Sequence, residues 1–215
     1  MNTLLPSLPL LAAFLAAAFV LAVTPGPGVL YVVTRTLSQG RASGFASVAG
    51  VALGNLGNAA AASVGLAALL ASSATLFEAV RYAGAAYLFY LGVQALRQGE
   101  AATSSSATRA SHGQVLRQGA LVALLNPKTT LFFAAFLPQF MQPSSAPVLQ
   151  ALALSSTFVG VAAISDCAYV LAAAAIYPAL RASPKGIGLG RYAAAIVYFL
   201  LSVYAAVAGS RPGKA

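Results

Sequence analysis

Long apolar runs limit how this chain can fold more than any other feature. No charged side chain occurs between Met1 and Thr34, and further apolar runs follow to the C-terminus. Apolar residues make up 60% of the 215 residues and charged residues only 7%, and the mean hydropathy is +0.83. A soluble domain of this length needs more charge, because most of its surface meets water. The sequence therefore predicts a membrane protein.

The apolar runs have the length of membrane-spanning helices. One span needs about 20 apolar residues, and the alternation typical of strands is absent while Ala and Leu dominate. We predict an all-α membrane protein with six transmembrane helices, over Leu8–Thr34, Gly44–Leu70, Leu76–Leu96, Val115–Phe140, Val148–Leu180 and Tyr192–Gly209.

A single long polar stretch, Gln98–Gln114, divides the chain into similar halves. We predict a first three-helix repeat over 1–97, a flexible cytoplasmic loop over 98–114, a second three-helix repeat over 115–209, and a tail over 210–215. Segments Arg81–Arg97 and Arg191–Val207 agree at 8 of 17 aligned positions. Because each half has an odd number of spans, similar halves must insert with opposite orientation, as inverted repeats.

Proline interrupts the first and fourth predicted spans at corresponding places. The breaks are Thr24-Pro25-Gly26-Pro27-Gly28 and Asn126-Pro127-Lys128. Proline removes a helical hydrogen bond, and in hydrocarbon the freed backbone groups must face protein or a wet cavity. N–H groups after a break suit a carboxylate, and carbonyls before it suit an ammonium.

Matched breaks in two membrane halves therefore predict a substrate-binding site. Its predicted members are Pro25, Gly26, Pro27, Asn126, Pro127, Lys128, Asn55 and Asn58. Two alternatives stay open: the prolines are structural kinks, and the asparagines make interhelical hydrogen bonds.

Asp166 is an acidic residue near the middle of the long fifth predicted span. Because an acid at membrane depth is costly, it should face the bundle interior or water and is functional by default. We predict that it couples transport to protons; a cation-binding role and a structural role beside Lys128 or Asn58 are the alternatives. Lys128 itself has three interpretations: contact with a substrate carboxylate, pairing with Asp166, and snorkelling to the inner surface.

Small residues recur every four positions in the second span, which is typical of close helix packing in lipid. The small residues and Asn58 lie on one helix face, which consists of Ala46, Gly50, Gly54, Asn58 and Ala62.

The net charge of +9 is explained by its location rather than by affinity for nucleic acid. If the N-terminus is outside, the inner loops carry Arg35, Arg41, Arg97, Arg109, Arg117, Arg181, Lys185 and Arg191, against Arg81, Arg211 and Lys214 outside. The positive-inside rule then favours both termini outside.

Several function classes lack the residues they need. The single cysteine, Cys167, excludes an intrachain disulfide and a CxxC pair, and the only histidine, His112, lies in the polar loop. No metalloprotease, nucleotide-binding or nucleophile-elbow motif occurs. We therefore expect no enzyme activity, no cofactor and no resident metal.

The same motifs resemble the LysE/RhtB family of bacterial amino-acid exporters over nearly the whole chain. The resemblance is carried by the Thr24–Pro27 break, the glycine-rich second span, Ala86–Arg97, Asn126–Phe140, and Asp166 with Tyr169. It implies an exporter of amino acids or close derivatives in the bacterial inner membrane, driven by the proton gradient.

The expected partners are a small amino acid, protons and membrane lipid, with no nucleic acid; a homo-oligomer is left open. A divalent-metal exporter is a rival interpretation, although hard cations prefer several oxygen ligands and the predicted membrane core holds one acid, Asp166. A non-transporting scaffold is the other rival, and it leaves the matched breaks unexplained.

Overall fold

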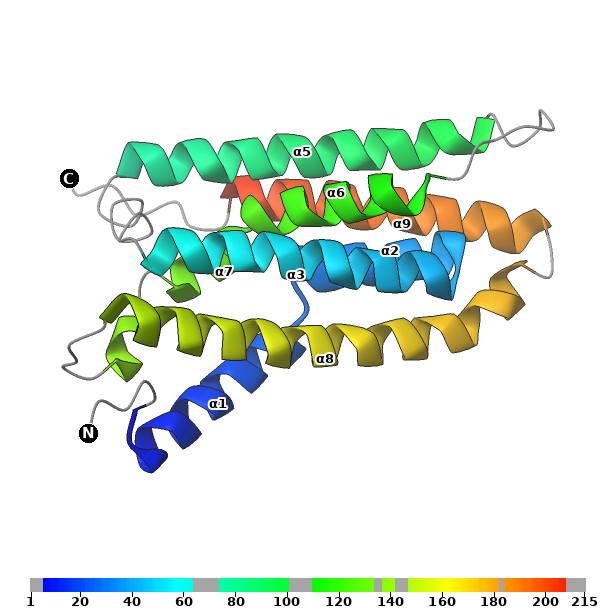
Figure 1. Cartoon of the computed structure of the whole chain (residues 1–215). Helices are drawn as coiled ribbons and strands as arrows, with labels where there is room; N and C mark the ends of the chain where they lie inside the picture. Colours follow the sequence, from blue (N-terminus) through cyan, green and yellow to red (C-terminus); the bar gives the residue numbers. More distant parts are fainter. Residues whose placement is uncertain are drawn as a thin grey trace.

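The computed structural model describes residues 6–63, 74–100, 110–133, 137–141, 147–181 and 184–207, and every regular element in these ranges is helical. In chain order they are α1 (Leu8–Val23), α2 (Pro27–Gln39), α3 (Arg41–Ser63), α5 (Ala74–Glu100), α6 (His112–Leu124), α7 (Pro127–Leu131), the 3-10 helix η3 (Leu137–Phe140), α8 (Pro147–Arg181) and α9 (Pro184–Val207) (Figure 1). The all-α prediction is confirmed for this part of the chain.

Both predicted helix breaks are present. After the first break, α2 begins at Pro27 and is bent by 47° from α1. After the second, α7 begins at Pro127. In each case proline occupies the first turn of the new half-helix, where its missing N–H costs nothing and its fixed φ suits helix.

Two described helices are long and apolar enough to cross a membrane, α3 and the Pro147–Pro178 part of α8. Taken as one broken span, α1 and α2 form a third candidate. The remaining predicted spans, and the six-helix count, stay predictions.

The helices lie along one another with alternating chain direction (Figure 1). The α1–α2 segment and the α6–α7 segment, which hold the two breaks, run in opposite directions, and α1 splays away from the bundle. Helix α3 packs against both α6 and α8, and α5 packs against α9.

Glycine brings α3 against the backbone of α6. A Cβ atom at Gly50 would collide with the Leu116 carbonyl, and one at Gly54 with the Ala120 carbonyl. On the same face, Asn58 Nδ2 donates to the Ala123 carbonyl at 2.8 Å. The predicted small-residue stripe is therefore a packing surface, as expected from its spacing.

A single residue, Gly40, joins α2 to α3. Its φ of +91° lies in the left-handed region, where L side chains are strained. An added Cβ would also press against the Tyr177 ring at 3.2 Å. The chain can therefore reverse within one residue only because glycine stands there.

The structure differs from the sequence expectations at two places. Arg35 does not lie in an inner loop: it is part of α2 and only 6% exposed. Helix also enters both ends of the predicted polar loop, since α5 extends to Glu100 and α6 begins at His112. The start of α6 lies this early because Ser111 caps the helix, accepting from the Gln114 N–H at 3.2 Å.

Buried apolar side chains form two clusters. One is rich in aromatic rings and joins α1, the α7–η3 region and α8; it includes Phe14, Phe132, Phe133 and Phe158. The other joins α2, α3, α5, α6, α8 and α9 and includes Tyr31, Val51, Leu91, Val115, Val170 and Tyr198. The candidate site lies where the two clusters meet, because both contribute residues to its lining.

Candidate functional site

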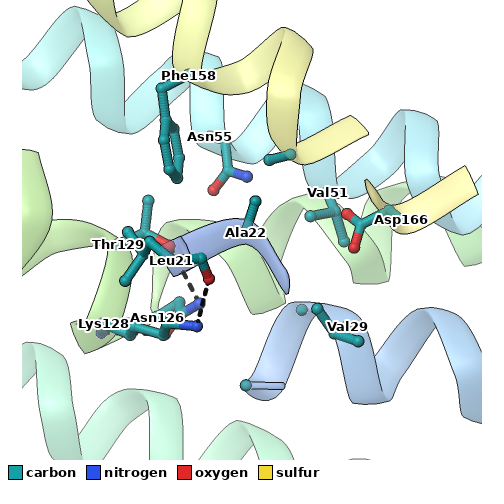
Figure 2. Close-up of a pocket in the computed structure, with 13 residues that line it drawn as sticks. Leu21, Ala22, Val29, Val51, Asn55, Asn126, Lys128, Thr129, Phe158 and Asp166 are labelled. Carbon is teal, nitrogen blue, oxygen red and sulfur yellow. Dashed lines mark hydrogen bonds between the residues drawn. The ribbon is translucent and has the colours of Figure 1, made fainter. Parts of the chain in front are cut away.

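A small cavity lies where the two helix breaks meet. Its volume is about 40 Å³, enough for a few water molecules at roughly 10–15 Å³ each on the same measure. The lining comes from both breaks, α3 and α8: Leu21, Ala22, Gly26, Gly28, Val29, Val51, Asn55, Asn126, Lys128, Thr129, Phe158, Ala162 and Asp166 (Figure 2).

Side chains satisfy every backbone carbonyl at the C-terminal end of α1. Lys128 Nζ donates to the Leu21 carbonyl at 2.9 Å and to the Thr24 carbonyl. From α8, Ser165 Oγ donates to Ala22 at 3.4 Å and Tyr169 Oη to Val23 at 2.8 Å. The Thr24 hydroxyl donates to Val20 at 2.6 Å. The carbonyls that we expected a substrate ammonium to use are therefore already occupied.

Gly26 allows Lys128 to reach those carbonyls. A Cβ at Gly26 would lie 3.2 Å from Lys128 Cδ and 3.5 Å from Nζ, so the lysine stem passes directly over the glycine. The structure supports neither the pairing of Lys128 with Asp166 nor its snorkelling to the surface. No ion pair joins it to Asp166 within the described residues, and its ammonium binds α1 instead of snorkelling to the surface.

Asn126 acts as the cap of α7. Its Oδ1 accepts from the Lys128 N–H and its Nδ2 donates to Thr129 Oγ1, both at 3.1 Å. Asparagine is a favoured N-cap because it satisfies an N–H that the helix leaves free. Its side chain therefore orients the half-helix that carries Lys128, and its polar atoms are committed to that task.

The N-terminus of α2 is open, in contrast to that of α7. Its N-cap is Gly26, which has no side chain to accept a hydrogen bond. No described group accepts from the N–H groups of Gly28 or Val29, and both residues line the cavity. Free N–H groups at a helix start carry a partial positive charge and favour an anion.

Asn55 contributes a side-chain hydrogen-bond acceptor that receives no hydrogen bond. It is 5% exposed, lines the cavity, and its Oδ1 has no hydrogen-bond partner within the described residues. A buried acceptor of this kind costs free energy of about 1–3 kcal/mol until a donor arrives. Asn55 is therefore available to a ligand, whereas Asn58 is bound to Ala123 and does not line the cavity.

Asp166 is also 5% exposed and faces the same cavity from α8. Among the described residues its carboxylate makes no hydrogen bond and no ion pair. In Figure 2 it lies across the lining from Lys128, with Asn55 above both of them in this view. One cavity thus holds a carboxylate and an amide oxygen near an open helix start.

The structure brings five of the nine predicted site residues to the cavity. They are Gly26, Asn55, Asn126, Lys128 and Asp166. Pro25 is exposed, Pro27 is buried, and neither lines the cavity; Pro127 begins α7, and its side chain lies outside the described part.

Sequence reasoning missed the role of Ser165 as a cap of α1 and the cavity residues Thr129 and Phe158. Ser165 and Tyr169 are four residues apart and flank Asp166, so they share a helix face. That spacing is the feature of the sequence that could have indicated a shared partner for Ser165 and Tyr169.

The cavity offers polar contacts for a small ligand. The described residues contain no group of three or more His, Cys, Asp or Glu side chains that could hold a metal ion. The cavity presents one carboxylate, one free amide oxygen and backbone N–H groups, and these suit a small molecule with a positive and a negative end.

An all-helical membrane protein with broken helices that meet at a polar cavity has the features of a secondary transporter. The family model described as LysE type translocator matches residues 19–209. The chain belongs to this family.

Named relatives include efflux proteins. The chain is 34% identical over 146 residues to a homoserine/homoserine lactone efflux protein of Salmonella typhimurium, covering 67% of this chain and 71% of that protein. It is 33% identical over 133 residues to a leucine efflux protein of Salmonella choleraesuis, covering 60% and 61%.

It is also 38% identical over 138 residues to an uncharacterised membrane protein of Pseudomonas aeruginosa, covering 61% of this chain and 64% of that protein. No solved structure matches.

Proposed function

We propose that this chain is a proton-coupled secondary transporter that exports a small amino acid or a close derivative across the bacterial inner membrane. The family and the printed names of the homoserine and leucine efflux relatives support export of this substrate class. The single observation that carries the proposal is the cavity, where buried Asp166 and the unpartnered Asn55 oxygen lie beside the open start of α2.

An amino-acid zwitterion complements these groups. Its ammonium would donate to the Asp166 carboxylate and to Asn55 Oδ1, which lack donors. Its carboxylate would accept from the Gly28 and Val29 N–H groups. The apolar part of the lining, which includes Phe158, would face an aliphatic side chain.

Competition between the substrate ammonium and a proton for Asp166 would couple substrate transport to proton transport. A buried carboxylate without a directly bonded counter-charge is costly in the membrane, so it gains from either a proton or an ammonium. If the two bind Asp166 alternately, substrate leaves when a proton arrives, which is the exchange that an antiporter needs. Lys128 leaves the carboxylate of Asp166 open to these ligands, since its ammonium is hydrogen-bonded to the carbonyl end of α1.

We further propose that the six predicted spans form two inverted repeats with both termini outside. The opposite directions of the α1–α2 and α6–α7 segments support this arrangement. Removing buried Arg35 from the eight inner basic residues leaves 8 − 1 = 7 against three outside, so the charge bias keeps its sign.

The cavity must widen during transport. At about 40 Å³ it is far smaller than the roughly 300–1,000 Å³ of typical ligand pockets. The proposed cycle therefore includes a state in which the broken helices separate and admit the substrate.

Counterflow in proteoliposomes tests the proposal. Vesicles loaded with unlabelled leucine, homoserine, homoserine lactone or lysine should each be assayed for uptake of the labelled compound, with Mn²⁺ as a separate cargo. We expect uptake of at least one amino acid, with loss of that uptake in Asn55→Leu and retention in Tyr90→Phe, an exposed position on α5. Transport of Mn²⁺ alone, or of none of these compounds, would contradict the proposal.

A further inference from the structure

A second cation is buried in the bundle, away from the cavity. Arg35 is 6% exposed and lies six residues beyond Val29 on α2, which is about 9 Å along the helix at roughly 1.5 Å per residue. Burying a guanidinium is costly unless a counter-charge or several acceptors surround it.

The acceptors around Arg35 are neutral. Its Nη2 donates to Gln118 Oε1 on α6, and Gln118 Nε2 donates to Gln94 Oε1 on α5 at 3.0 Å. The guanidinium carbon lies 5.4 Å from the centre of the Tyr31 ring, and the Tyr31 hydroxyl donates to the Val115 carbonyl at 2.7 Å. The Arg35 Nε has no partner within the described residues.

Tyr198 supplies a second donor without an acceptor. It is 2% exposed, its ring centre is 6.4 Å from that of Tyr31, and its hydroxyl has no hydrogen-bond partner within the described residues. Two buried donors that lack acceptors thus belong to one cluster of α2 and α9.

No acidic side chain that the structure describes neutralises Arg35. The chain has three acidic residues. Asp166 lines the cavity, Glu78 is exposed on α5, and the side chain of Glu100 lies outside the described part. With Lys128 included, the described interior holds two cations and one acid, so an anion entering this cluster would balance the charge.

We propose that Arg35, Tyr198 and Gln118 form a second binding site, which takes the carboxylate of the transported amino acid between the cavity and the C-terminal end of α2. The inference rests on the proposed function and adds a second substrate-binding site to the transport pathway. A carboxylate would replace the Gln118 amide oxygen on Arg35 and accept from Arg35 Nε and the Tyr198 hydroxyl. With both termini outside, this site faces the cytoplasm, where an exported substrate arrives.

Leucine and leucinamide distinguish this role from a structural one, because leucinamide keeps the amine and lacks the carboxylate. The variants are Arg35→Lys, which keeps the charge and loses the planar fork, and Tyr198→Phe, which keeps the ring and loses only the hydroxyl. Tyr90→Phe on the exposed face of α5 is the matched control. Leucine KM and maximal counterflow rate are measured in proteoliposomes, together with the inhibition constant of leucinamide and the melting temperature.

We expect the leucine KM to rise about tenfold in Arg35→Lys and about threefold in Tyr198→Phe, as lost hydrogen bonds to a charged group predict. The maximal rate, the leucinamide inhibition constant and the Tyr90→Phe values should stay at wild-type levels. Equal losses for leucine and leucinamide, or an unchanged leucine KM in both variants, would overturn the second site while leaving the proposed function intact. A wild-type protein that transports no amino acid would overturn both.

Discussion

Lys128 joins the two breaks through a single side chain. It extends from the start of α7 to the end of α1 and donates to the Leu21 and Thr24 carbonyls. A half-helix end inside a membrane needs such donors because no water replaces them. A lysine ammonium, with three donors on a flexible stem, suits two carbonyls that point in different directions.

Removing the ammonium should destabilise the folded protein. In Lys128→Met the apolar stem remains, but the two carbonyls lose their donor, so we expect a loss of about 1–3 kcal/mol. The melting temperature in detergent, followed by size-exclusion chromatography, measures this loss. Lys128→Arg is the control that keeps the charge, and an unchanged melting temperature in Lys128→Met would show that the contact adds nothing to stability.

Asp166 should control the coupling to protons. In Asp166→Asn the side chain keeps its shape and an acceptor oxygen but cannot exchange a proton, so accumulation of leucine driven by a pH gradient should be abolished while gradient-free counterflow survives with a raised leucine KM. Glu78→Gln, a change at an exposed acid on α5, should leave both activities intact. Wild-type accumulation in Asp166→Asn would place the proton path elsewhere.

At the scale of elements, the contact between α3 and α6 depends on glycine. Gly50→Ala would drive a methyl group into the Leu116 carbonyl of α6, and we expect destabilisation of about 1–3 kcal/mol from this overpacking. Gly160→Ala on α8, where nothing lies within 4 Å, should be neutral or slightly stabilising. Thermal unfolding of the two variants side by side makes the comparison, and equal melting temperatures would contradict the close contact.

The features that the sequence predicted correctly are local. Pro27 and Pro127 mark helix starts by their own chemistry, and Gly50 and Gly54 mark a close packing face by their spacing. Asp166 lies at the cavity, as a lone acid in an apolar segment predicts, because such an acid must face protein or water rather than lipid. Each inference needed only the neighbouring residues.

The features that the sequence did not predict depend on which helices meet. Lys128 binds a carbonyl end that lies more than 100 positions away, at Leu21 and Thr24. Arg35 looked like a loop residue because it follows a long apolar run, but α2 continues past it and packs it against Gln118. No periodicity in one segment reports its partner in another.

At the scale of the whole molecule, the orientation of the halves is open to direct measurement. In a Cys167→Ala background, single cysteines at Ser105 and Ser145 should react with membrane-impermeant maleimide from opposite sides, Ser105 from the cytoplasm. The opposite directions of the two broken segments and the basic inner loops are the reasons for this expectation. Labelling of both from the same side would contradict the inverted repeats.

The capped end of α1 also has a consequence for biosynthesis. Lys128, Ser165 and Tyr169 all belong to the second half, so during translation α1 enters the membrane before its donors have been synthesised. Unsatisfied carbonyls at membrane depth cost several kcal/mol each, and the first half should be held by the insertion machinery or degraded until the second half arrives. A fragment of residues 1–100 expressed alone should therefore be short-lived in pulse-chase labelling, and co-expression of residues 110–215 should extend its lifetime, whereas a co-expressed 110–215 fragment carrying Lys128→Met should extend it less.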